Sequence, residues 1–124
     1  MSDDLLALPR VDATPAGVTL GCLTAIADGT ARGFVLRIGA TRFHGLVVRR
    51  GGQAHGYVDR CPHAGLPLAR GDATIVTADG TLIECHWHGA LFEVESGSCV
   101  GGPCVGARLT PWAVSVRDGL LVTD

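Results

Sequence analysis

The sequence lacks the features that mark export, membrane insertion and nucleic-acid binding. No apolar run reaches the roughly 18 residues that a membrane-spanning helix needs. Residues 1–4 include two aspartates where a secretory signal is basic, and no apolar stretch follows them. The one adjacent basic pair, Arg49-Arg50, precedes two glycines and is typical of a turn rather than of a phosphate-binding surface. We therefore expect a cytoplasmic protein that binds neither membranes nor nucleic acids.

Lysine and asparagine are absent, and aromatic residues are scarce. All ten basic residues are arginine, which we attribute to coding bias, and Phe, Trp and Tyr make up 5% of the chain. The net charge is only −2, with acidic and basic residues spread along the sequence. Apolar residues account for 47% of the 124 positions, which is enough for one domain with a buried core.

A disulfide framework is a poor account of the cysteines. There are five of them, an odd number, in a chain without an export signal. Metal ligation is the better default for cysteines in an intracellular protein.

Short apolar segments separated by turn signals indicate an all-β domain with many hairpins. Two of the turns are Gly51-Gly52 and Asp118-Gly119, and the second is the strongest hairpin signal in the chain. No stretch of 12 or more residues has the 3.6-residue apolar spacing of a helix, so we expect little helix. The segments that we expect to form strands are 20–26, 33–38, 43–48, 54–58, 113–117 and 120–123.

Residues 61–102 interrupt this pattern and predict a small subdomain inserted into a β base. The base would consist of residues 17–60 and 103–124, giving a single domain over 17–124. Residues 1–16 contain two prolines and predict a flexible N-terminal segment.

Inside the inserted subdomain we expect one hairpin and one further strand. The hairpin would join residues 74–77 to 81–84 through Ala78-Asp79-Gly80, and the strand would cover 91–95. A Gly-Gly-Pro turn at 101–103 would close the subdomain.

Two cysteine–histidine pairs carry the chemistry of the chain. Cys61-x-His63 and Cys85-x2-His88 offer two thiolates and two imidazoles, a set that suits zinc or an iron–sulfur centre. Zinc fingers commonly pair Cys with Cys and His with His. Here each loop supplies one ligand of each kind, as a binuclear cluster with chemically distinct irons requires. His86 is adjacent to a ligand, but the spacing favours His88.

The two motifs, C-P-H-A-G-L-P-L at 61–68 and C-H-W-H-G-A-L-F at 85–92, resemble the signature of Rieske 2Fe–2S proteins. The resemblance covers residues 18–124 and implies an antiparallel β sandwich or barrel base with an inserted cluster-binding subdomain. It further implies Cys61 and Cys85 on one iron, and His63 and His88 on the other. The 21 residues between His63 and Cys85 exceed the spacing of compact members, and we place the excess in the hairpin after residue 70.

Residues missing around the motifs lead us to expect the low-potential branch of the family that the motifs resemble. High-potential members of the family that the motifs resemble have a disulfide between the two cluster loops and two hydroxyl side chains after the second histidine. The matching positions here are Leu66 and Trp87 for the disulfide, and Ala90 and Phe92 for the hydroxyl groups. Without hydroxyl donors to the cluster sulfurs the reduced state is less stable. We expect a potential towards the low end of the roughly −150 to +300 mV span of such centres.

The resemblance implies a stand-alone, monomeric ferredoxin that carries single electrons. Its partners would be a flavin-containing reductase and an oxygenase. The chain has no second metal triad and no room for a catalytic domain, so we do not expect it to be an enzyme by itself. Three alternatives remain: a small subunit of a larger redox enzyme such as a nitrite-reductase-like complex, a structural zinc module, or a redox sensor using a Cys99–Cys104 bridge.

We expect the remaining cysteines and histidines to have structural roles rather than to bind the metal. Cys22 lies in an apolar strand and is expected in the core. Cys99 and Cys104 flank the Gly-Gly-Pro turn; they could pair, shield the cluster or be small buried hydrophobes, and the last is the commonest role of a free cysteine. His44 and His55 are expected on the surface.

Overall fold

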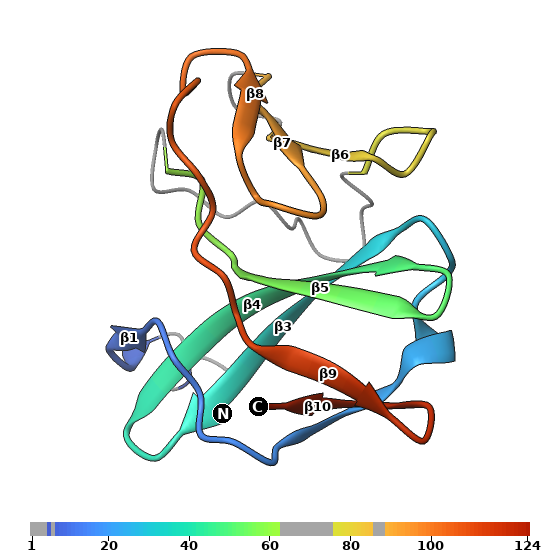
Figure 1. Cartoon of the computed structure of the whole chain (residues 1–124). Helices are drawn as coiled ribbons and strands as arrows, with labels where there is room; N and C mark the ends of the chain where they lie inside the picture. The colour runs from blue at the N-terminus through green and yellow to red at the C-terminus, as the bar shows by residue number, and fades with distance from the viewer. Residues whose placement is uncertain (1–4, 6, 63–75, 86–88) are drawn as a thin grey trace.

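The computed structural model describes residues 5, 7–62, 76–85 and 89–124, which form three β-sheets (Figure 1). The first sheet contains β1 (Arg10–Val11), β3 (Ala31–Ile38), β4 (Thr41–Arg50) and β5 (Gln53–Val58). The second contains β2 (Thr19–Cys22), β9 (Val114–Arg117) and β10 (Leu120–Thr123). The third contains β6 (Leu82–Glu84), β7 (Leu91–Glu93) and β8 (Cys99–Gly101). None of the helical segments among the described residues is long and apolar enough to cross a bilayer.

Strands β3, β4 and β5 form an antiparallel meander, as the apolar pattern predicts. Phe34, Leu36 and Ile38 lie on one face of β3 and pack against the base core. The turn between β4 and β5 is Gly51-Gly52, where Gly51 has a φ of +62° that favours glycine. The Asp118-Gly119 hairpin between β9 and β10 is also confirmed; both turn residues have positive φ, as a two-residue hairpin turn needs.

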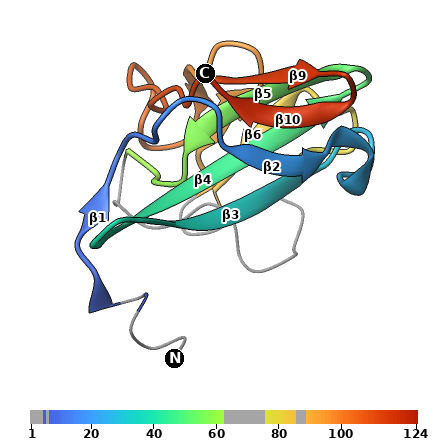
Figure 2. The ribbon, with the colours of Figure 1, turned by 90° about the horizontal axis from the view of Figure 1, so that it is seen from below.

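The second sheet lies across the first and encloses the core of the base between them (Figures 1 and 2). Trp112 is the centre of this core: it is 5% exposed, and its ring centroid lies 4.7 Å from that of Phe43. Gly45 makes room for the indole, because a Cβ at this position would lie 2.3 Å from a Trp112 ring carbon. The base core comprises Leu23, Ile26, Phe43, Val47, Val58, Trp112 and Leu121.

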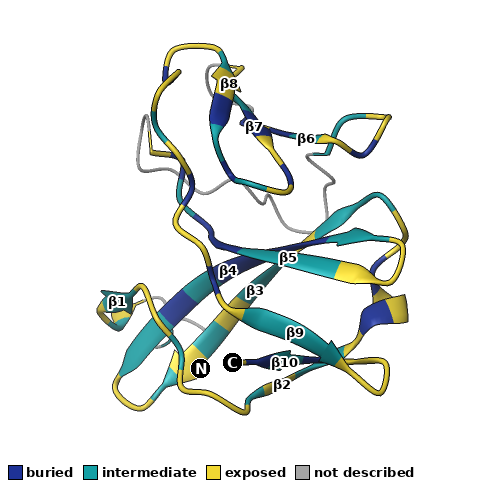
Figure 3. Ribbon diagram, viewed as in Figure 1, coloured by how far each residue is buried: buried dark blue, intermediate teal, exposed yellow. Residues whose placement is uncertain are grey.

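The third sheet stands at the opposite end of the molecule from the second sheet and the C-terminus, and a second buried core lies beneath it (Figures 1 and 3). We call this part, residues 61–62, 76–85 and 89–109, the cluster end. A buried hydrogen bond joins it to the base, since the Tyr57 hydroxyl of β5 donates to the Val94 carbonyl oxygen at 2.6 Å. The cluster-end core comprises Leu46, Val48, Tyr57, Cys61, Ile83, Cys85, Ala90, Phe92, Val94, Cys99, Cys104 and Leu109.

The prediction for residues 20–26 is half wrong. β2 ends at Cys22, and a 3-10 turn, η1 (Leu23–Ala25), follows. Leu23 and Ile26 are the buried members of this segment, and their spacing of three suits a 3-10 turn. Cys22 is exposed rather than in the core, because it closes a strand whose neighbour, Leu120 of β10, is itself 38% exposed.

Part of the N-terminal segment is attached to the base. β1 pairs in parallel with the start of β4, and the Arg42 backbone N–H donates to the Pro9 carbonyl. The Arg42 guanidinium also donates to the Leu8 carbonyl. The division into a flexible segment and a domain from residue 17 stays a prediction.

The predicted hairpin of the cluster end lies partly within the described residues. Val76 bridges to Ile83, and the Thr77 N–H donates to the Leu82 carbonyl. Residues 74 and 75 lie outside the described residues. The strand predicted at 91–95 is shorter, since β7 ends at Glu93, and β8 was not predicted.

Candidate metal centre

Cys61 follows β5 at the junction between the base and the cluster end. The backbone around it is held to two other segments: the Val58 N–H donates to the Thr110 carbonyl, and the Asp59 N–H donates to the His44 carbonyl. The Cys61 side chain is fully buried, whereas the next residue, Pro62, is exposed. Cys61 therefore points into the core where the chain reaches the surface.

Cys85 follows β6 and is hydrogen-bonded through its backbone to residues 89 and 90. Its N–H donates to the Ala90 carbonyl at 2.8 Å, and the Gly89 N–H donates back to the Cys85 carbonyl at 3.0 Å. Gly89 has a φ of +71°, which explains the glycine after the second motif. These bonds hold Cys85 to Gly89 and Ala90, and the Cys85 side chain is 1% exposed.

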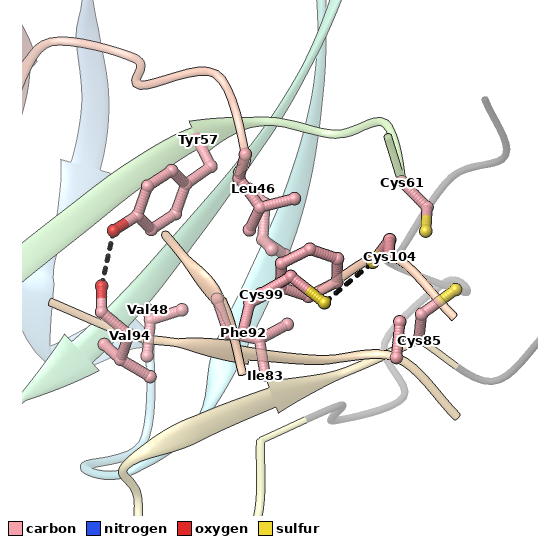
Figure 4. Packing of buried hydrophobic residues seen from close by; sticks show 12 residues of the cluster. Leu46, Val48, Tyr57, Cys61, Ile83, Cys85, Phe92, Val94, Cys99 and Cys104 are labelled. Carbon is pink, nitrogen blue, oxygen red and sulfur yellow. Dashed lines mark hydrogen bonds between the residues drawn. The ribbon is translucent and has the colours of Figure 1, made fainter. Parts of the chain in front are cut away.

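The structure brings the thiols of the two motifs into one buried core (Figure 4). Cys99 and Cys104 lie in the same core, so the cluster-end core holds four of the five cysteines. Burial raises the pKa of the Cys104 thiol to about 12, and its hydrogen bond with Cys99 and the nearby Cys61 and Cys85 act in the same direction. Cys104 is therefore a neutral thiol at physiological pH.

The turn after β8 forms a third wall beside the second motif. A Cβ at Gly102 would lie 2.8 Å from the Ala90 Cα and 2.9 Å from the Gly89 oxygen. Only glycine permits this approach, and its φ of +82° adds a second reason. The sequence predicted this turn but not its contact with the 89–90 backbone.

Ala90 and Phe92 are both fully buried in the cluster-end core. Neither side chain has a hydroxyl group, which is the feature from which we predict a low reduction potential. The surroundings of the second motif are thus apolar on the described side, with Ile83 as another fully buried neighbour.

The predicted histidine positions cannot be placed beside these thiols, since His63, His86 and His88 lie outside the described residues, as do Leu66 and Trp87. The other two histidines are half-buried rather than on the surface. His44 accepts a hydrogen bond from the Arg42 guanidinium, and burial lowers its pKa, with Arg10 and Arg42 acting in the same direction. Neither His44 nor His55 belongs to the cluster-end core that contains the thiols.

The sequence reasoning missed Tyr57, which links the two cores. Its ring also fills the space next to Gly97, where a Cβ would lie 2.7 Å from a tyrosine ring carbon. The available signal was that Tyr57 is the one tyrosine of the chain, at the end of an apolar strand shortly before the first motif.

Comparison with known proteins decides the family. Residues 27–116 match the Rieske [2Fe-2S] domain family. The chain belongs to this Rieske family. The predicted resemblance is thereby confirmed, and the cofactor of the family is a Rieske-type 2Fe–2S cluster.

Two curated relatives of the Rieske chain are ferredoxins. It is 30% identical over 98 residues to the p-cumate 2,3-dioxygenase system ferredoxin component of Pseudomonas putida, which covers 78% of this chain and 79% of that protein. It is 36% identical over 85 residues to Ferredoxin CarAc of Metapseudomonas resinovorans, covering 68% of this chain and 72% of that protein.

A solved structure confirms the all-β fold class. A chain in the complex of reduced oxygenase and oxidized ferredoxin of carbazole 1,9a-dioxygenase superposes with a TM-score of 0.68 at 30% identity, covering 84% of this chain and 97% of that one. The Rieske base and cluster end described above thus occur together in a known ferredoxin fold.

The described residues fit half of the donor set of a Rieske cluster. Such a cluster has one iron held by two thiolates. Cys61 and Cys85 come from different segments, yet both lie in the same buried core as the apolar side chain of Phe92. When bound, the cluster takes up and releases one electron; the protein residues hold it, exclude water from its thiolate side and set the polarity around it.

Proposed function

We propose that this Rieske chain is a ferredoxin that carries single electrons from a flavin-containing reductase to an oxygenase. Both curated relatives are ferredoxins, one of them a component of a dioxygenase system, and the solved relative is in a complex with an oxygenase. The chain is a carrier in such a system rather than its catalyst. We further propose that it acts as a monomer in the cytoplasm.

The ligands in this proposal are Cys61 and Cys85 on one iron, and His63 and His88 on the other. The observation that carries it is the burial of Cys61 and Cys85 in one core, although 24 positions separate them in the sequence. The hydrogen bond from the Gly89 N–H to the Cys85 carbonyl, with the positive φ of Gly89, supports the backbone at the second motif.

The proposed potential is low, because Ala90 and Phe92 are buried without a hydroxyl group to offer the cluster sulfurs. Redox titration followed by visible absorption tests this directly. We expect a one-electron transition towards the low end of the roughly −150 to +300 mV span. A potential above roughly +100 mV on that scale would contradict the low-potential assignment.

A fixed subunit of a larger redox enzyme is the second candidate, since the same cluster would serve either role. Size-exclusion chromatography of the native protein separates the two. A free ferredoxin elutes as a monomer at every concentration, whereas a fixed subunit co-purifies with a large partner. The zinc-module alternative is dropped, because the family holds an iron–sulfur cluster.

A further inference from the structure

Cys99 and Cys104 form a close thiol pair that the electron-carrying site does not use. Their Sγ atoms are 2.8 Å apart, and the side chains are 5% and 8% exposed (Figure 4). A disulfide bond is about 2.05 Å long, so the sulfurs need to approach by only about 0.75 Å from their 2.8 Å separation to form one.

The backbone holds both cysteines to the same residue. The Cys99 N–H donates to the Ala107 carbonyl at 2.9 Å, and the Ala107 N–H donates to the Cys104 carbonyl at 2.9 Å. Between the two cysteines the chain reverses at Gly102, whose φ of +82° permits the sharp turn. The close approach of the thiols is therefore built into the fold of the segment from 99 to 107.

The hydrogen bonds of the pair are ordered. The Cys99 thiol donates to the Gly101 carbonyl oxygen at 3.1 Å. Its sulfur is then the acceptor in the Cys99–Cys104 contact, and Cys104 is the donor. The reduced pair is thus a satisfied dithiol, and the oxidised pair would leave only the Gly101 carbonyl to find another donor.

The pair differs from the other cysteines in its surroundings. Cys22 is exposed in the base, and Cys61 and Cys85 belong to the two Rieske motifs. Among the residues that the structure describes, no group of three or more Cys, His, Asp or Glu side chains is arranged to hold a metal ion. A two-sulfur role needs no third residue, and the 2.8 Å separation of the Cys99 and Cys104 sulfurs is sufficient for it.

We propose that Cys99 and Cys104 are a modification site, a reversible intramolecular disulfide formed by exchange with a small disulfide such as oxidised glutathione. One cysteine thiol gives up its proton and attacks the small disulfide as a thiolate, which forms a mixed disulfide; the departing small thiolate takes up a proton and leaves as a thiol. The second cysteine thiol then loses its proton, attacks the protein sulfur of the mixed disulfide and releases the other small thiol. The protein loses two electrons and two protons, and the small disulfide is reduced to two thiols.

Disulfide formation would have two consequences at the cluster end. It closes the segment 99–104 covalently beside Ala90, against which Gly102 packs. It also removes two of the four thiols of this core, which leaves only Cys61 and Cys85 able to bind iron there. The surface next to Cys104 gives a reagent access, since Pro103 is exposed and Val105 is 68% exposed.

Labelling of the native protein in glutathione buffers tests the proposal. The protein is equilibrated anaerobically at graded ratios of reduced to oxidised glutathione, quenched with acid, denatured and alkylated with N-ethylmaleimide. Trypsin then releases the peptide 71–108, which contains Cys85, Cys99 and Cys104 and ends at its one basic residue, Arg108. Mass spectrometry counts the labels on this peptide.

We expect three labels in reduced glutathione and one label, on Cys85, at equal concentrations of the two forms. Return to reduced glutathione should restore three labels. Cys99→Ser and Cys104→Ser should each give two labels at every ratio, and Cys22→Ser, as the matched control, should behave as the wild type. Three labels at every ratio, or a disulfide that includes Cys85, would overturn the proposal. Because the labels are counted without reference to the cluster spectrum, this outcome is separate from failure of the electron-carrier function.

Discussion

The base and the cluster end are both all-β, but their cores differ in amino-acid composition. The base core is aliphatic and aromatic, with Trp112 packed on Phe43. The cluster-end core also has aliphatic and aromatic members, such as Leu109 and Phe92, but four of its twelve buried residues are cysteines. A core of large apolar side chains is stable without a ligand, whereas metal binding to thiolates contributes folding free energy. The base should therefore be the permanent scaffold, and the cluster end should depend on its cofactor.

Replacing a motif cysteine should separate the two regions most strongly. We expect Cys85→Ala to lose nearly all bound iron and the visible absorption of the cluster. The base should keep its near-ultraviolet circular dichroism from Trp112, because that residue is buried in the other core. Cys22→Ser, exposed in the base, should keep the full iron content. Loss of the Trp112 signal together with the iron would show that the two regions are one cooperative unit.

Trp112→Ala should destabilise the base and leave the iron–sulfur cluster unchanged. Removing a buried tryptophan costs about 3–5 kcal/mol of unfolding free energy, since it leaves a cavity between the two base sheets. At temperatures where the variant is still folded, the visible spectrum of the cluster should match that of the wild type. Chemical denaturation measures the cost, and Leu109→Ala, in the cluster-end core, tests whether the loss of the Trp112 environment is specific to the base.

Tyr57→Phe should weaken the link between the regions. It removes the donor to the buried Val94 carbonyl, and an unsatisfied buried group costs about 1–3 kcal/mol. Burial also raises the pKa of Tyr57 above its ordinary value of 10.0, so the stability that the neutral phenol provides is present below pH 10.0 and is lost as the pH rises above it. Denaturation curves of wild type and variant should therefore converge at high pH. A constant difference across this range would contradict the account.

Ala90→Ser should raise the reduction potential by up to about 59 mV, because a tenfold change in the equilibrium constant of a one-electron couple has this size. The new hydroxyl would donate to the cluster sulfurs and favour the reduced state. Redox titration measures the shift. Ala54→Ser, on β5 in the base, is the matched control and should leave the potential unchanged.

Asp79→Asn should have the smallest effect. The Asp79 carboxylate accepts hydrogen bonds from Thr77 and Thr81, and these lower its pKa from 3.8 to about 2. Its contribution is present above pH 3.8 and is lost as the pH falls through about 2. The variant should be slightly less stable than the wild type at neutral pH, and thermal unfolding in acid should show the difference shrink. A difference that grows towards acid would contradict this assignment.

Local signals predicted much of this architecture. Asp118-Gly119 and Gly51-Gly52 specify two-residue turns, because few other residues adopt their backbone angles. The cysteine motifs predicted a site because four ligands at these spacings rarely serve another purpose. The burial of Cys61 and Cys85 in one core agrees with that prediction, and the roles of His63 and His88 stay predictions.

What the sequence did not predict depends on contacts between distant segments. Cys22 is exposed although its neighbours are apolar, since the edge of a sheet is set by tertiary packing. β8 is too short to have an apolar period of its own and forms because β7 lies beside it. Arg10 of β1 acts electrostatically on the half-buried His44 of β4, across a parallel pairing of segments that are distant in the sequence. None of these contacts has a signature within a short window of sequence.

The electron paramagnetic resonance spectrum of the dithionite-reduced protein tests the central claim most directly. Two cysteines on one iron and two histidines on the other predict an average g value below that of a four-cysteine 2Fe–2S cluster. A spectrum like that of a four-cysteine cluster would contradict the assignment of His63 and His88 and would bring Cys99 and Cys104 in as ligands.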